Sequence, residues 1–223
     1  FDTLKRETGL PNSAHFMAVA GAFDYANAAV IRVPKDAVEG NSIEDHSRYI
    51  VDNLASLVAP RCGTLVLFSS RRQMEGVFDE LSNDLQKQIL IQGQYSNREM
   101  IRLHKERIDQ GKTSVLLGLA SFAEGVDLPG DYCRHVVIAK LPFAVPDEPL
   151  QEALAEWIED RGGNSFFDIS LPVASLRLIQ ACGRLLRTES DSGTVTILDK
   201  RLITKRYGAQ LLNALPPFRR EIG

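Results

Sequence analysis

Two arginines and a glutamine at helical spacing are the residues whose types point most directly to chemistry. Gln180, Arg184 and Arg187 lie in the segment Gln-Ala-Cys-Gly-Arg-Leu-Leu-Arg, and on a helix their spacings of four and three residues place them on one face. Two guanidinium groups one turn apart suit the oxygens of a polyphosphate and the charge that develops during γ-phosphoryl transfer. Taken alone, the pattern equally fits an amphipathic helix with surface arginines.

A second candidate is the glycine-containing segment at residues 118–130, which follows a run of apolar residues. Loops that follow the strands of an α/β sheet commonly bind ligands. Gly125 permits close backbone approach, and Glu124 and Asp127 supply acceptors for hydroxyl groups or arginine. A simple strand-to-loop connection stays open as the alternative.

A third candidate follows the apolar run at residues 63–68, where two hydroxyls and two cations lie at the start of an expected helix. Ser69, Ser70 and Arg71 suit phosphate binding, because hydroxyls, backbone amides and a helix N-terminus all favour anions. Helix capping by either serine is the alternative. A similar polar cluster at residues 92–96 ends the next expected strand, so the set favours ligand binding at one edge of a sheet.

The elements that must position these residues follow from hydrophobic periodicity. We expect strands at residues 15–20, 29–33, 63–68, 89–92, 114–119, 136–139 and 194–198. We expect helices at residues 43–58, 71–81, 97–110, 150–160, 174–187 and 204–215. This alternation predicts an α/β fold with three layers, in which a mainly parallel sheet is flanked by helices. With no repeat or linker in view, residues 1–223 are expected to form one domain.

The composition indicates an ordinary globular protein, with 44% hydrophobic and 25% charged residues and a net charge of −3. Residues 147–168 hold seven acidic side chains and one basic one, whereas residues 177–223 hold nine basic and four acidic. Solvated faces of unequal sign explain this asymmetry, and the basic tail is also compatible with phosphate contact. No apolar run is long enough to suggest a membrane span.

The remaining reactive residues show no self-contained site. The three cysteines, Cys62, Cys133 and Cys182, are far apart and are expected to be buried, reduced thiols, which favours an intracellular protein. The four histidines lack metal-binding spacing, so no metal site is predicted. Gly111-Lys112-Thr113 resembles the tail of a phosphate-binding loop, but it lies between a helix and a strand in the wrong order.

Several of these segments together resemble one known family. Residues 180–187 match the Gln-x-x-Gly-Arg-x-x-Arg motif VI of superfamily-two helicases, and residues 121–127 are similar to motif V of the XPD/DinG branch. Residues 63–71 and 92–96 resemble motifs IV and IVa, and residues 23–25 and 197–208 resemble the entry and the end of this domain in DinG relatives. The whole chain therefore resembles the C-terminal RecA-like domain of a DinG-type helicase.

The resemblance implies an ATP-dependent, 5′-to-3′ DNA helicase of repair or replication, cytoplasmic and nucleoid-associated in a bacterium. ATP and Mg²⁺ would lie between two RecA-like halves, with the ATP-binding half and a 4Fe–4S cluster expected upstream of Phe1 and none of the three cysteines as cluster ligands. Arg184 and Arg187 would be arginine fingers.

The remaining site residues carried by the resemblance fall into two groups. Those expected to help bind nucleotide are Gln180, Glu124, Gly125 and Asp127. Those expected to contact single-stranded DNA are Ser69, Ser70, Arg71, Gln94 and Ser121. The partners implied are single-stranded DNA and the upstream half of the same polypeptide, without which this chain would be inactive. The alternatives are a non-catalytic nucleic-acid-binding or protein-interaction module with the same fold, and an exonuclease-linked or RNA-directed relative.

Overall fold

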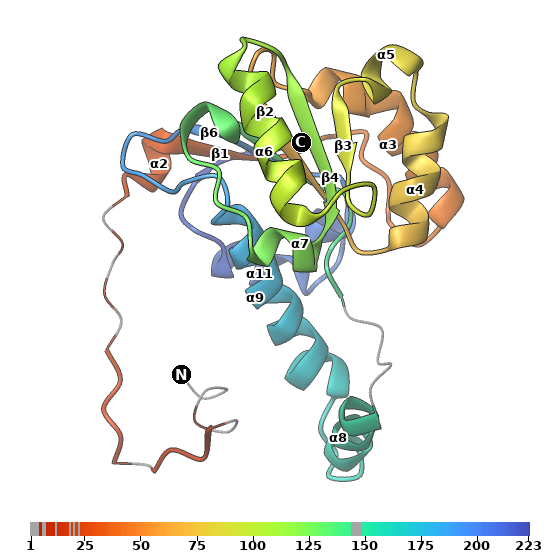
Figure 1. The fold of residues 1–223 in the computed structure, drawn as a ribbon. Helices are drawn as coiled ribbons and strands as arrows, with labels where there is room; N and C mark the ends of the chain where they lie inside the picture. Colours follow the sequence, from red (N-terminus) through yellow and green to blue (C-terminus); the bar gives the residue numbers. More distant parts are fainter. Residues whose placement is uncertain are drawn as a thin grey trace.

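The computed structural model describes residues 5, 8–11, 13–17, 19, 21, 23–143 and 149–223, with the side chains of residues 150 and 151 excepted. In this part of the chain seven strands form one parallel sheet, in the order β3-β4-β2-β5-β6-β1-β7 (Figure 1). The strands are β1 (Ala29–Val33), β2 (Gly63–Phe68), β3 (Ile89–Ile91), β4 (Ser114–Leu119), β5 (His135–Ile138), β6 (Gly193–Ile197) and β7 (Arg219–Ile222).

Helices connect these strands and cover both faces of the sheet. The helices and helical turns are α2 (Tyr25–Ala28), α3 (Ile43–Leu57), α4 (Arg71–Glu80), α5 (Asn83–Gln86), α6 (Asn97–Asp109), α7 (Ala120–Glu124), η1 (Gly130–Tyr132), α8 (Pro149–Glu159), η2 (Phe166–Ser170), α9 (Leu171–Cys182), α10 (Arg201–Thr204) and α11 (Gly208–Ala214). The predicted three-layer α/β class is confirmed.

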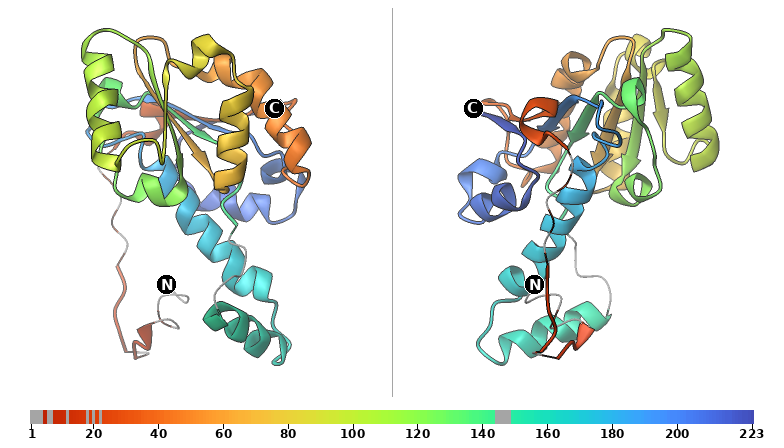
Figure 2. Two further views of the ribbon diagram at one scale, coloured as in Figure 1. Left: turned by 45° about the vertical axis from the view of Figure 1, so that its right-hand side comes forward. Right: turned by 90° about the vertical axis from the view of Figure 1, so that its left-hand side faces the viewer.

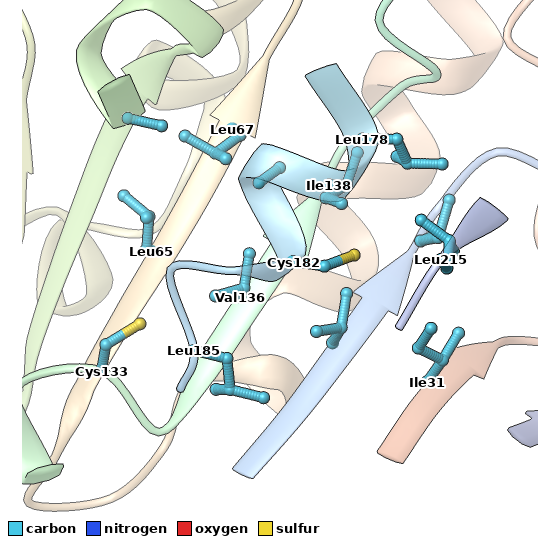
Figure 3. Close-up of a cluster of buried hydrophobic side chains, with 14 of the residues drawn as sticks. Ile31, Leu65, Leu67, Cys133, Val136, Ile138, Leu178, Cys182, Leu185 and Leu215 are labelled. Carbon is cyan, nitrogen blue, oxygen red and sulfur yellow. The ribbon is translucent and has the colours of Figure 1, made fainter. Parts of the chain in front are cut away.

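Alternation along the buried strands divides the core into two clusters, one on each face of the sheet. All six residues of β2 are buried, and neighbouring side chains such as Leu65 and Val66 point to opposite faces. The Leu65 cluster packs under α6, α7, α9 and α11, and Figure 3 shows part of it. The Val66 cluster packs under α3, α4 and α5. Each helix is therefore fixed by its apolar stripe.

Helix α9 connects the segment that contains α8 and η2 to the sheet. Figures 1 and 2 show α8 away from the sheet, at the far end of α9, which then runs back onto the sheet beside α7. Cys182, the last residue of α9, is fully buried in the core together with Leu178. This packing brings the segment after α9 to the loop that follows α7.

The expected strands at residues 29–33 and 63–68 match β1 and β2, and the others expected from residue 89 onward agree with the structure within one residue at each end. The strand expected at residues 15–20 is wrong for residues 15–17 and 19, whereas residues 18 and 20 lie outside the described residues. The described part of this segment belongs to no strand, and Met17 and Val19 are 82% and 77% exposed. An apolar pattern alone makes no strand where no neighbouring strand supplies hydrogen bonds.

Two expected helices have different bounds. The helix expected at residues 174–187 begins earlier, at Leu171, and ends at Cys182, so Arg184 and Arg187 lie beyond it. The helix expected at residues 204–215 is shorter in the structure: α11 covers Gly208–Ala214, and residue 204 is the last residue of the preceding α10. A Cβ atom at Gly208 would lie 2.0 Å from the Leu202 carbonyl oxygen, so only glycine fits where the chain turns from α10 into α11.

Candidate nucleotide and nucleic-acid interface

The two motif arginines converge on one loop, although they do not share a helical face. Arg184 Nη1 donates a hydrogen bond of 2.9 Å to the carbonyl oxygen of Val126. Arg187 Nε lies 2.7 Å from Asp127 Oδ1, in an ion pair whose side chains are 37% and 66% exposed. The expectation of a common helical face is wrong because α9 ends at Cys182, but both guanidinium groups meet the loop between α7 and η1.

The guanidinium group of Arg184 is partly buried and lies near a second cation. Burial lowers its pKa below the usual range, the positive charge of Arg187 lowers it further, and the carboxylates of Asp127 and Glu124 only partly offset these effects. The buried Arg184 Nε makes no hydrogen bond with any of the described residues. A guanidinium group with an unused donor beside a second cation is suited to binding an anion.

Gln180 and Glu124 lie with Arg184 around one small cavity. Its volume is about 10 Å³, roughly the space that a single water needs. Its lining residues come from β2, α7, α9 and the segment after α9, and are Leu67, Ala120, Ala123, Glu124, Arg177, Gln180, Ala181 and Arg184. Three of the predicted nucleotide-site residues are thus brought together.

Gly125, at the end of α7, is exposed, and a Cβ atom added there would meet nothing within 4 Å. Neither the packing nor the backbone of the chain itself therefore requires glycine at this position.

The polar residues predicted to contact DNA lie at the carboxyl edge of β2, β3 and β4, which are neighbours in the sheet. Ser69, Gln94 and Ser121 are exposed. Ser70 caps α4, because its side chain accepts a hydrogen bond of 3.4 Å from the backbone N–H of Gln73. The capping alternative is therefore realised at Ser70, whose hydroxyl can still donate to another group.

Arg71 and Gln92 connect the three strand ends. Arg71 Nη1 donates a hydrogen bond of 3.5 Å to the Gln92 carbonyl oxygen, and it also lies 3.7 Å from Glu75. The side-chain oxygen of Gln92 accepts a hydrogen bond of 2.8 Å from the backbone N–H of Leu119, just before α7. The segments that resemble motifs IV, IVa and V are consequently held together at one edge.

Two buried aspartates at this site were missed from the sequence. Asp191 is 4% exposed and accepts hydrogen bonds from the backbone N–H groups of Gly130, Arg187 and Thr188. It therefore joins the loop after α7 to the segment after α9. The only signal in the sequence was a carboxylate in a polar turn just before a strand, which is usually solvated.

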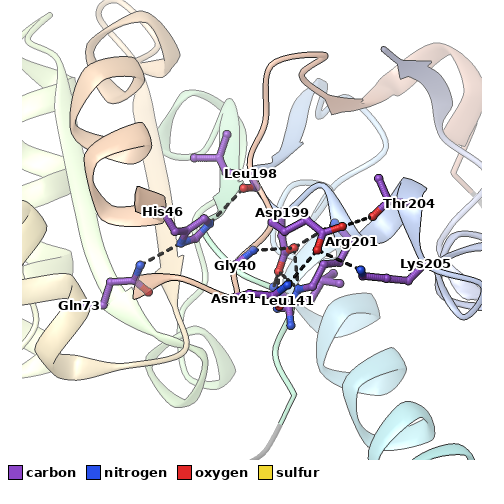
Figure 4. Close-up of polar contacts among 11 residues, drawn as sticks. Gly40, Asn41, His46, Gln73, Leu141, Leu198, Asp199, Arg201, Thr204 and Lys205 are labelled. Atoms are coloured by element: carbon purple, nitrogen blue, oxygen red, sulfur yellow. Dashed lines mark hydrogen bonds and ion pairs between the residues drawn. The ribbon is translucent and has the colours of Figure 1, made fainter. Parts of the chain in front are cut away.

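The second aspartate, Asp199, follows β6 and is fully buried (Figure 4). Its carboxylate accepts hydrogen bonds from Arg201, with a shortest distance of 2.6 Å, and from the backbone N–H groups of Gly40 and Leu141. Burial alone would raise the pKa of Asp199, but the hydrogen bonds and charge of Arg201 hold it below its usual value. The network joins α10 to the ends of β5 and β6 and to the loop before α3.

The three cysteine side chains are free thiols. Burial raises the pKa of Cys133 and Cys182 to about 12 and also raises that of the half-buried Cys62. The prediction of buried thiols is confirmed for Cys133 and Cys182 and is only partly met by Cys62. Within the described ranges, no group of three or more His, Cys, Asp or Glu side chains is arranged to hold a metal ion.

Comparison with known proteins identifies the family. The model of the Helicase C-terminal domain matches residues 54–218, and the chain belongs to this family. It is 44% identical over 95% of its length to the "ATP-dependent DNA helicase DinG" of Photobacterium profundum, and 38% identical over 98% to that of Escherichia coli K12. The chain spans 31% of the length of each of these relatives.

Solved structures support the same fold. An XPD helicase structure superposes with a TM-score of 0.64 at 21% identity, covering 88% of this chain and 36% of the other. The structure of S. tokodaii Xpd4 gives a TM-score of 0.63 at 16% identity, covering 95% of this chain and 41% of the other. The RecA-like fold is therefore shared with these helicases. Among the described residues, no helix combines the length and apolar character needed to cross a membrane.

Proposed function

We propose that this chain is the second motor domain of an ATP-dependent DNA helicase, in which ATP binds between residues 1–223 and a domain encoded upstream. Family membership and the printed names of the relatives support this assignment. The observation that carries it is the convergence of Arg184 and Arg187 on the loop that contains Val126 and Asp127. A surface helix with unrelated arginines would give no reason for this convergence.

The residues present fit a triphosphate contributed from another domain. Arg187 is partly exposed, and among the described residues its ion-pair partner is the more exposed Asp127, a contact that is worth at most about 1 kcal/mol in water. A phosphate oxygen can therefore replace this carboxylate at low cost. The resemblance assigns Mg²⁺ mainly to the upstream domain.

In the proposed mechanism, Arg187 leaves Asp127 and donates to the γ-phosphoryl oxygens, where it stabilises the charge that develops during hydrolysis. Arg184 acts from the neighbouring position, because its guanidinium group lies close enough to Arg187 for the two positive charges to interact. Gln180, Glu124 and Gly125 complete this wall of the nucleotide site. When phosphate departs, Arg187 returns to Asp127 and the attraction between the two halves is lost, which permits alternating grip on DNA.

Single-stranded DNA is proposed to cross the carboxyl edge of β2, β3 and β4. Ser69, Ser70, Arg71, Gln94 and Ser121 offer hydroxyl, amide and guanidinium donors to its phosphates. The 5′-to-3′ polarity, the role in repair or replication, the cytoplasmic and nucleoid-associated location, and a 4Fe–4S cluster in the upstream region rest on the resemblance alone.

The test is ATP turnover by the full-length protein that the complete open reading frame encodes, measured with saturating single-stranded DNA. Arg184→Ala and Arg187→Ala should each lower turnover by about a thousandfold or more, as loss of an arginine finger does elsewhere. Arg48→Ala is the control, because Arg48 is 66% exposed on α3 and its ion-pair partner within the described ranges is the exposed Glu44. Turnover within about twofold of wild type in both motif variants would refute the proposed role.

The same experiment separates the alternatives. A full-length protein that binds single-stranded DNA but lacks DNA-stimulated ATP hydrolysis would indicate a non-catalytic module. Stimulation by RNA rather than DNA would indicate an RNA-directed relative, and degradation of the strand would reveal an associated exonuclease. The isolated 223-residue chain is expected to hydrolyse no ATP.

A further inference from the structure

The buried carboxylate of Asp191 connects the two segments that carry the proposed nucleotide-binding residues. Its Oδ2 accepts hydrogen bonds from the backbone N–H groups of Arg187, at 2.6 Å, and Thr188, at 2.7 Å. Its Oδ1 accepts from the backbone N–H of Gly130, at 2.9 Å, and from the Thr188 hydroxyl, at 2.8 Å. Both oxygens are thus used, and each is shared between two donors.

The carboxylate of Asp191 is charged at neutral pH. Burial alone would raise its pKa, but hydrogen bonds from Arg187, Thr188 and Gly130 outweigh this effect and hold the pKa below its usual value. Hydrogen bonds to an ionised acceptor are stronger than those between neutral groups. A neutral amide at this position would accept fewer of the four donors and would turn its own N–H groups toward some of them.

Arg187 has few other restraints. Helix α9 ends at Cys182, so the backbone of Arg187 is not fixed by helical hydrogen bonds. Its side chain is 37% exposed, and its ion pair with Asp127 is accessible to water. A long side chain in that setting keeps considerable rotamer freedom. The hydrogen bond from the Arg187 backbone N–H to Asp191 therefore fixes the backbone position from which the guanidinium group extends.

We propose that Asp191 is a positioning residue for Arg187. Asp191 fixes the backbone of Arg187, from which the guanidinium group projects. Through its hydrogen bond with Gly130, it also holds this segment against the loop after α7, so that Arg187 and Asp127 remain within contact distance. This inference rests on the proposed function, because a fixed starting position matters only if Arg187 acts during phosphoryl transfer.

The test is a double-mutant cycle in the full-length protein, in which Asp191→Asn, Arg187→Ala and the double variant are compared with wild type. Asp191→Asn should lower kcat for ATP about a hundredfold, the cost of a misplacement near 1 Å, with the KM for ATP nearly unchanged. In the Arg187→Ala background the same substitution should have almost no further effect. Asp131→Asn is the matched control, because this neighbouring carboxylate is 61% exposed and is paired only with Arg134, and it should behave as wild type.

The outcomes distinguish the two proposals. If Asp191→Asn lowers turnover by the same factor with and without Arg187, Asp191 is merely structural and the positioning role is overturned. Near-normal turnover of Asp191→Asn beside a severely impaired Arg187→Ala overturns this inference alone. Near-normal turnover of Arg187→Ala overturns the proposed function itself.

A milder variant keeps the inference testable if Asp191→Asn does not fold. Thr188→Val removes the hydroxyl donor to Asp191 Oδ1, together with a 3.1 Å contact to the exposed Ser190 hydroxyl, and leaves both backbone hydrogen bonds of Oδ2 in place. It should cause a smaller loss of kcat that also disappears in the Arg187→Ala background. An equal loss in both backgrounds would overturn the positioning role.

Discussion

Removal of the Asp199 carboxylate should destabilise the fold far more than removal of any exposed acid. Asp199 is fully buried, and its partner Arg201 is 15% exposed. In Asp199→Ala the Arg201 guanidinium loses its partner, and the backbone N–H groups of Gly40 and Leu141 lose an acceptor (Figure 4). Breaking one side of a buried ion pair costs about 3–5 kcal/mol, so we expect that loss in the free energy of unfolding.

The assay is urea denaturation of the 223-residue chain followed by circular dichroism. In a chain of this size the expected loss corresponds to a melting temperature lower by about 10 °C. Asp199→Asn keeps the shape and part of the hydrogen bonding, so it should cost less, about 2 kcal/mol. Asp84→Ala, at a carboxylate 92% exposed and paired with Lys87, should change stability by less than about 0.5 kcal/mol.

The pH dependence of this difference gives a second check. Because the folded pKa of Asp199 lies below its unfolded value, its stabilising effect is fully present above the unfolded pKa of about 3.9. The effect is lost as pH falls through the lower, folded pKa. Wild type and Asp199→Asn should therefore converge in strongly acidic solution. A cost below about 1 kcal/mol for Asp199→Ala at neutral pH would refute the assigned role of the network.

Two further predictions concern a buried histidine and the carboxyl edge of β2, β3 and β4, where single-stranded DNA is proposed to bind. Burial lowers the pKa of His104 to about 4, so the unfolded chain takes up a proton first and stability should fall by about 2 kcal/mol between about pH 7 and about pH 4.5. His104→Gln should remove that part of the slope in urea denaturation, and an unchanged slope would contradict it. In the full-length protein, Arg71→Ala should weaken binding of single-stranded DNA and reduce the slope of log K against log salt concentration by about 0.7. Arg48→Ala should change neither quantity. Equal slopes for wild type and Arg71→Ala in fluorescence anisotropy would count against a phosphate contact at Arg71.

Local sequence was a good guide wherever one element determines its own structure. The apolar run at residues 63–68 predicted a strand, and every residue of β2 is buried. The helix expected at residues 97–110 matches α6 within one residue, because local signals bound it: Ser96 caps its first turn, and Gly111 with its φ of +70° follows its end. These signals operate within a few residues, so they can be identified without knowledge of tertiary contacts.

The parts that sequence did not predict depend on partners far along the chain. Helix α9 ends before Arg184 because the following segment is held by Val126 and Asp191 instead of by further helical turns. Strand β7 was missed because its four residues are all exposed and mostly charged, as suits the edge of a sheet. The buried aspartates were missed for the same reason, since burial of a carboxylate depends on donors brought to it by the fold.

The arrangement around α7 gives a physical route between the two proposed sites. Leu119, before this helix, is held by Gln92 from the DNA edge, and Val126, after it, is held by Arg184 from the nucleotide side. Between them, Phe122 and Ala123 are buried in the core, so the helix cannot shift without disturbing packing. Under the proposed function, a change in the contacts of Arg184 on ATP binding would therefore act on one end of a short, well-packed helix whose other end contacts the carboxyl edge of β3.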